Sequence, residues 1–122
     1  MTNGAKLLIK WLKENVLNTY QEPVNSNASL PYISLSYVEN EFASQTAQQL
    51  TIWTRSDASY QEAYSYADKL SKLIGESGVL IKDNDLGTIV IYKGSPFCQN
   101  RLDDTTTIRA VLINLLITNY NN

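Results

Sequence analysis

The side chains that could carry chemistry in this sequence are one cysteine, two short acidic clusters and a group of lysines. None of the 122 residues is a histidine. This removes the commonest general base, the commonest metal ligand and every Ser-His or Cys-His pair. The five glycines form no phosphate-binding pattern. We therefore expect no enzymatic activity, no cofactor and no bound metal.

Cys98 is the only cysteine, and it lies in a segment, residues 95–104, that we predict to be an irregular loop. A cysteine becomes a nucleophile when a nearby base or cation activates its thiol. Only Arg101 is close in sequence, so we interpret Cys98 as a structural thiol. Because one cysteine cannot form an intrachain disulfide, a reducing compartment is the simplest interpretation.

The two acidic clusters have ordinary structural interpretations. Asp103 and Asp104 are adjacent, and adjacent side chains of an extended chain face opposite ways, so they do not form a dyad that shares a proton. They suit a solvated loop, or ion pairs with Arg101 and Arg109. Residues 83–87, Asp-Asn-Asp-Leu-Gly, partly resemble a calcium loop. They lack a third ligand before the glycine and the distal glutamate, so we predict a turn.

Charge and hydropathy exclude two further classes of partner. The net charge is −2, and the lysines of the first predicted helix suit a solvated face, so we expect no nucleic-acid binding. The longest apolar stretch, residues 110–117, is interrupted by Asn114. It is much shorter than the ~20 residues that span a bilayer, so we expect no membrane segment.

Hydrophobic periodicity predicts the elements that position these residues. Two helices are expected, over residues 3–19 and 59–74; Asp57 and Ser59 are candidate caps of the second, and Gly75 or Gly78 ends it. Strands are expected at 31–38, 47–55, 79–81, 88–92 and 105–120, with loops at 20–30 and 95–104. The order is α-β-β-α-β-β-β. We predict one α+β domain, residues 1–122, with a largely antiparallel sheet and both helices on one face.

Aromatic content and the last strand point to contacts with other chains. Eight tyrosines and two tryptophans are typical of interfaces, and Tyr64 lies outside the apolar stripe of its helix. Tyrosines at the edge of the core, with their hydroxyls in water, are an equal alternative. From Ile108 to Ile117 both faces of the last strand are apolar, although two helices can cover only one face of a small sheet. Either the sheet curls on itself or a second chain covers the other face, and we favour the second chain. The predicted interface residues are Tyr64, Arg101, Asp103, Asp104, Arg109, Val111 and Ile113.

Several segments also resemble a known family. They are the strand 31–35, Pro-Tyr-Ile-Ser-Leu; the strand-to-helix junction Leu-Thr-Ile-Trp-Thr-Arg-Ser at 50–56; the Gly-Ser-Pro-Phe loop at 94–97; Arg-Leu-Asp-Asp at 101–104; and the closing strand. Together the chain resembles the tail terminator proteins of long-tailed bacteriophages, also called tail-completion or minor capsid proteins. The resemblance covers nearly the whole chain, although none of its motifs is diagnostic.

The resemblance implies a non-enzymatic virion protein that is assembled in the host cytoplasm. It implies a homohexameric ring that caps the tail tube and joins it to the head, with the tail tube protein and head-connector proteins as partners. An adaptor or stopper of the head-to-tail region is a close variant. A small-ligand regulatory module of ferredoxin-like type is an alternative from another class, and an enzyme using Cys98 or Asp103 has the least support.

Overall fold

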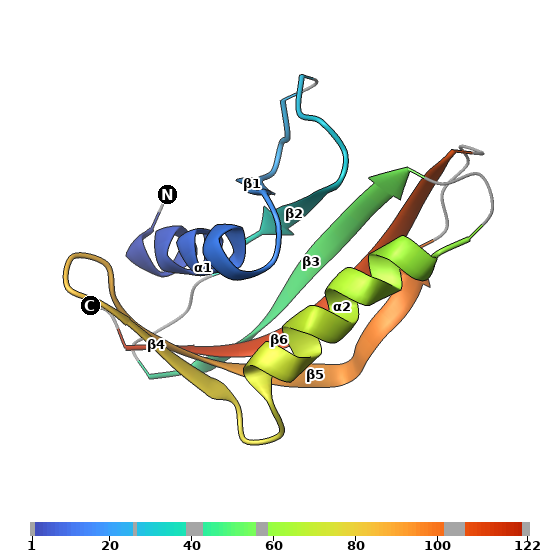
Figure 1. Ribbon diagram of the computed structural model, residues 1–122. Coiled ribbons are helices and arrows are strands. Elements are labelled where there is room, and N and C mark those ends of the chain that lie inside the picture. Colours follow the sequence, from blue (N-terminus) through green and yellow to red (C-terminus); the bar gives the residue numbers. More distant parts are fainter. Residues whose placement is uncertain (1, 26, 39–42, 56–58, 102–106, 121–122) are drawn as a thin grey trace.

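The computed structural model describes residues 2–25, 27–38, 43–55, 59–101 and 107–120 (Figure 1). Within these ranges it contains two helices and six strands. Their bounds are α1 Asn3–Asn15, β1 Thr19–Gln21, β2 Tyr32–Ser36, β3 Gln45–Arg55, α2 Gln61–Ile74, β4 Val79–Asp83, β5 Gly87–Arg101 and β6 Ile108–Asn119.

The first helix begins where a threonine can satisfy its free amides. The Thr2 hydroxyl accepts a hydrogen bond from the Ala5 amide at 3.3 Å, which is an ordinary N-cap. The stripe of Leu7, Leu8 and Leu12 is buried, as its helical spacing predicts. The helix ends at Asn15 and not at residue 19, because the chain then turns into strand β1.

The second helix ends as predicted, but its start differs. Gly75 has a φ of +71°, and its amide donates to the Ser71 carbonyl at 3.0 Å. The N-cap position is Tyr60, with no side-chain cap. The Ser59 hydroxyl accepts from the Gln61 amide at 3.3 Å, but Ser59 lies one residue before the N-cap position for which it was predicted. Asp57, the other predicted cap, lies outside the described residues.

All six strands form one sheet in the order β1-β2-β3-β6-β5-β4. Only β1 and β2 pair in parallel, so the predicted α+β class and largely antiparallel sheet are confirmed. The predicted order is wrong by one element, since the observed order is α-β-β-β-α-β-β-β. The extra strand, β1, lies at the start of the predicted loop, where three residues are too few to show a period.

Strand β5 continues through residues 95–101 of the predicted loop 95–104, and residues 102–104 lie outside the described residues. Its register against β6 shifts between Lys93 and Cys98, so the Gly-Ser-Pro-Phe segment forms an irregularity and pairing then resumes to Arg101. An irregularity of this kind tolerates proline, which cannot donate to the ladder. A Cβ on Gly94 would lie 2.8 Å from the Asn114 carbonyl oxygen, so the strands approach closely here.

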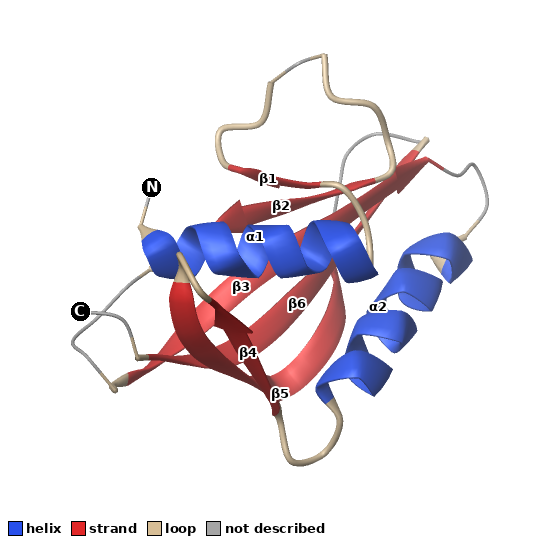
Figure 2. Ribbon diagram, turned by 60° about the vertical axis from the view of Figure 1, so that its left-hand side comes forward, coloured by secondary structure: helices blue, strands red, loops and turns tan. Residues whose placement is uncertain are grey.

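One face of the sheet, the inner face, forms the core with both helices. Its fully buried residues are Ile33, Leu35, Leu50, Ile52, Ile89, Ile91, Val111, Ile113, Leu115 and Ile117. The sheet is strongly curled (Figure 2). Helix α1 contacts β1, β4 and β5, whereas α2 contacts β3, β5 and β6. The prediction of two helices on one face therefore does not describe the curl, which divides the inner surface between them.

Candidate protein interface

Strand β6 has one face in the core and one face outside it. Because side chains alternate along a strand, its odd-numbered residues lie on the inner face and its even-numbered residues on the outer face. Val111 and Ile113 are both 0% exposed within this single chain. Their prediction as interface residues is therefore wrong. The outward residues, Leu112 and Leu116, are half-buried and do not belong to the core.

Further apolar side chains extend the outer face toward strand β4. Tyr92 of β5 opposes Leu116 and is 37% exposed, and Leu80 on the edge strand β4 is 56% exposed. The Tyr92 ring lies against Gly78, where an added Cβ would come within 2.5 Å of a ring carbon. These residues, Leu80, Tyr92, Leu112 and Leu116, are called the outer apolar patch below.

At the other end of the outer face, aromatic rings and a guanidinium form a row across the sheet. The ring centroids of Tyr20 and Tyr32 lie 5.7 Å apart, and those of Tyr32 and Trp53 lie 6.4 Å apart. The Arg101 guanidinium lies 5.0 Å from the Trp53 ring centroid, a cation–π distance. The Trp53 indole donates to the Ser34 hydroxyl at 2.9 Å, which fixes the indole on the sheet.

Two open depressions flank the pair formed by Tyr32 and Trp53, which is called the Tyr32/Trp53 ridge below. One depression, of about 520 Å³, is lined by Ala28, Ser29, Leu30, Arg55 and Ile108 with the ridge. The other, of about 540 Å³, is lined by Glu22, Pro23, Val24, Ser34 and Arg101 with the ridge. Of these lining residues, only Arg101 is among the predicted interface residues. In the sequence, the alternation of residues 47–55 puts Trp53 and Arg55 on the same face of their strand, and this pattern alone could have indicated that they lie together.

The structure does not gather the remaining predicted interface residues at one place. Tyr64 is 40% exposed on α2, and its hydroxyl donates to the Asn100 side-chain oxygen on β5. Arg109 is half-buried, with its guanidinium 5.8 Å from the Tyr60 ring centroid at the start of α2. Arg101 joins the aromatic row. Asp103 and Asp104 lie outside the described residues.

The environment of Cys98 does not activate its thiol. Cys98 lies on β5 opposite Ile113 and is half-buried. Burial, followed by the nearby charge of Asp68, raises the pKa of the thiol. A thiol with a raised pKa is protonated at neutral pH and is a poor nucleophile.

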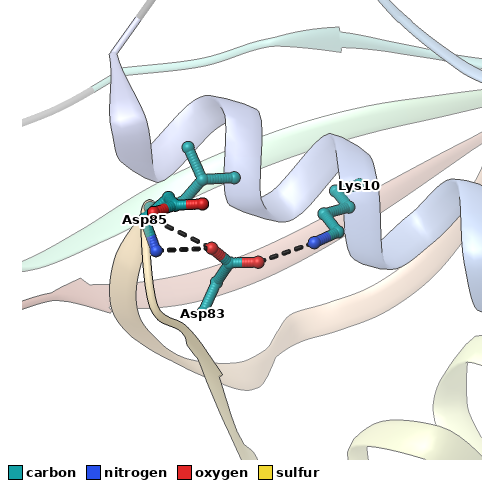
Figure 3. A network of polar contacts seen from close by, with 4 residues as sticks. Lys10, Asp83 and Asp85 are labelled. Atoms are coloured by element: carbon teal, nitrogen blue, oxygen red, sulfur yellow. Dashed lines mark hydrogen bonds and ion pairs between the residues drawn. The ribbon is translucent and has the colours of Figure 1, made fainter.

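The acidic turn between β4 and β5 is an ion-paired turn (Figure 3). Asp83 accepts backbone hydrogen bonds from Asp85 at 2.8 Å and Leu86 at 3.0 Å, and its other oxygen lies 2.6 Å from Lys10 Nζ. The hydrogen bond from Lys10, followed by those two amides, lowers the pKa of Asp83 to about 2. The predicted turn is therefore confirmed. The described ranges hold no group of three potential metal-ligating His, Cys, Asp or Glu residues.

Within the part of the chain that the structure describes, neither helix has the length and apolar character needed to cross a bilayer. Comparison of the sequence with models of known protein families gave no match, and comparison with curated protein sequences gave no significant match. The geometry of the outer face is therefore what indicates a candidate interface. The outer apolar patch lies toward one end of this face, and the Tyr32/Trp53 ridge, with Arg55 and Arg101 beside it, lies toward the other.

Proposed function

We propose that this chain is a non-enzymatic assembly protein of a bacteriophage or prophage virion, a tail terminator that forms a ring through contacts between copies of itself. In this role it caps the tail tube and joins it to the head, assembles in the host cytoplasm and stays in the virion. The sequence resemblance supplies the family, and one observation supports self-association. The outer apolar patch is left outside the core of the single chain.

The chemistry of the outer apolar patch suits contact with another protein. Its four side chains are uncharged, and β6 presents only Asn114 as a polar side chain between Leu112 and Leu116. The Asn114 amide is engaged within the chain, because it donates to the Pro96 carbonyl at 2.9 Å. A surface of this kind can be buried by a second copy without leaving a charge in the interface, where an unpaired charge is costly.

The test is the mass of the protein in solution, measured by sedimentation over a wide concentration range. We expect a six-fold mass for the ring. Leu116→Lys places a charge in the outer apolar patch and should shift the protein toward monomer. Leu73→Lys is the matched control, because Leu73 is 37% exposed on α2, away from this patch.

The outcomes separate the proposal from its alternatives. A dimer at all concentrations favours a ligand-binding module. A strict monomer, with no ring on isolated tail tubes by electron microscopy, contradicts the proposal. An effect of Leu73→Lys without an effect of Leu116→Lys would place the interface on α2 and not on the outer face.

A further inference from the structure

We propose that the Tyr32/Trp53 ridge is a binding site for an extended acidic segment of a partner protein. The site shares no residue with the outer apolar patch, which it borders where Leu112 opposes Thr51, and the inference does not depend on the proposed function. Three observations support it: the two depressions beside the ridge, the arginine that lines each depression, and the contacts that the aromatic rings make within the chain.

Each depression presents a guanidinium that has no carboxylate partner among the described residues. Arg55 lines one depression and Arg101 the other. The one ion pair found within the described ranges joins Lys10 and Asp83, far from both. Arg101 donates to the Thr51 hydroxyl at 3.3 Å, which leaves most of its five donor hydrogens for a ligand. Guanidinium groups of this kind bind carboxylates by paired hydrogen bonds.

Among the described lining residues the single carboxylate is Glu22, which forms no ion pair with either arginine. Its Oε1 accepts from the Ser34 hydroxyl at 3.2 Å, on the side of the ridge where Arg101 lies. The described lining residues of the two depressions together therefore carry two positive charges and one negative charge. This local excess is opposite in sign to the net charge of the chain, −2. Charge complementarity favours an acidic ligand at this place.

The ring geometry disfavours nucleic acid as the ligand. Bases bind to aromatic side chains by stacking on open ring faces. Arg101 already lies over the Trp53 ring, and the rings of Tyr20 and Tyr32 meet edge to face with an interplanar angle of 82°. Arg101 and Tyr20 thus cover part of the two ridge rings, and the apolar sides that remain form walls along the two depressions. Such walls suit the side chains of an extended peptide.

The spacing of the two arginines suits an extended segment. In the sheet register Arg55 opposes Ile108, and Arg101 opposes Ala110 from the other side of β6. The two positions differ by two residues along the strands and by two strands across the sheet. Strand geometry then puts their Cα atoms on the order of 12 Å apart. A polyproline II segment repeats every three residues, or about 9 Å, so acidic residues three positions apart lie on the same side of it. Two such acidic residues can therefore reach Arg55 and Arg101, one each.

The experiment uses Trp53 fluorescence in the full chain. Trp11→Phe removes the other tryptophan and keeps an aromatic ring at a half-buried position. The probe is an acetylated and amidated peptide of three Glu-Pro-Pro repeats, and the control peptide has Gln in place of each Glu. We expect saturable binding of the Glu peptide, weakened by salt, and at least several-fold weaker binding of the Gln peptide.

Variants of the arginines then test the assignment. Arg55→Gln and Arg101→Gln should each weaken binding about two- to fivefold, the range for an exposed ion pair. Lys72→Gln, an exposed charge on α2, is the matched control and should leave affinity unchanged. Thermal unfolding of each variant checks that the fold is intact. Equal affinity for the Glu and Gln peptides, no loss in either arginine variant, or a response to oligothymidylate in place of the Glu peptide would overturn the proposal.

Discussion

Two neighbouring residues of β6, Ile113 and Leu112, should lose very different amounts of stability on the same substitution. Ile113 is 0% exposed and belongs to the core, where it opposes Leu50 on β3 and Cys98 on β5. Ile113→Ala removes buried carbons and leaves a cavity, which costs about 2–5 kcal/mol of unfolding free energy. The unfolding entropy of roughly 2.1 cal/mol/K per residue means that 1 kcal/mol lowers the Tm of a chain of this size by about 4 °C. The expected decrease is about 8–20 °C.

Leu112 should tolerate the same change. It is half-buried on the outer face, opposite Thr51 and Gln99. No closed cavity can form there, so Leu112→Ala should cost less than about 1.5 kcal/mol. The assay is thermal unfolding followed by circular dichroism, at protein concentrations low enough that self-association does not add to stability. Equal losses for Leu112 and Ile113 at low concentration would refute the assignment of an inner and an outer face.

Three further predictions test other parts of the structure. The pKa of Asp83 is lowered from 3.8 to about 2, chiefly by the hydrogen bond from Lys10. The ionised Asp83 carboxylate therefore stabilises the fold fully above about pH 4, and this stabilisation is lost as the pH falls toward 2. In acid titrations of stability, Asp83→Asn should flatten the profile between these two pH values. Gly94→Ala should cost about 1–3 kcal/mol, because the new Cβ meets the backbone of β6, whereas Ser95→Ala beside it should be nearly neutral in urea unfolding. Cys98→Ser should leave the sedimentation mass unchanged, and a lost assembly with an intact fold would contradict the structural role of this thiol.

Sequence periodicity predicts the parts of this fold that are long and regular. Helix α2 and the β2–β3 hairpin follow from residue spacing alone, because each buries a repeating set of apolar side chains. Two features do not follow. Strand β1 has three residues and no period, and it is held by backbone pairing with β2, 14 positions later in sequence. Strand β5 passes through Gly94 and Pro96, residues that usually end a strand, because the irregularity against β6 accommodates them.

Which face of β6 lies in the core depends on the register of β6 against β3. The alternation along β6 separates its residues into two sets, but it does not say which set faces the helices, since both are apolar. Strand β3 resolves the choice, because Leu50 and Ile52 lie on one side, whereas Gln49, beside them, and Thr51, between them, lie on the other. In the observed register Leu50 opposes Ile113 and Ile52 opposes Val111, so both of those β6 residues are in the core. A shift of one residue in that register would reverse the result.

The two ends of the outer face differ in a way that matters for assembly. The outer apolar patch is uncharged, so a contact there should depend weakly on salt. The Tyr32/Trp53 ridge carries Arg55 and Arg101, so a contact there should weaken as salt rises. If the chain uses the patch for its own copies and the ridge for a partner, raising salt should release the partner while the ring stays intact. The measurement is sedimentation of the ring with its bound partner at low and at high salt. Release of the partner from an intact ring supports two separate contacts. Loss of the partner and dissociation of the ring at the same salt concentration would place both contacts on one surface.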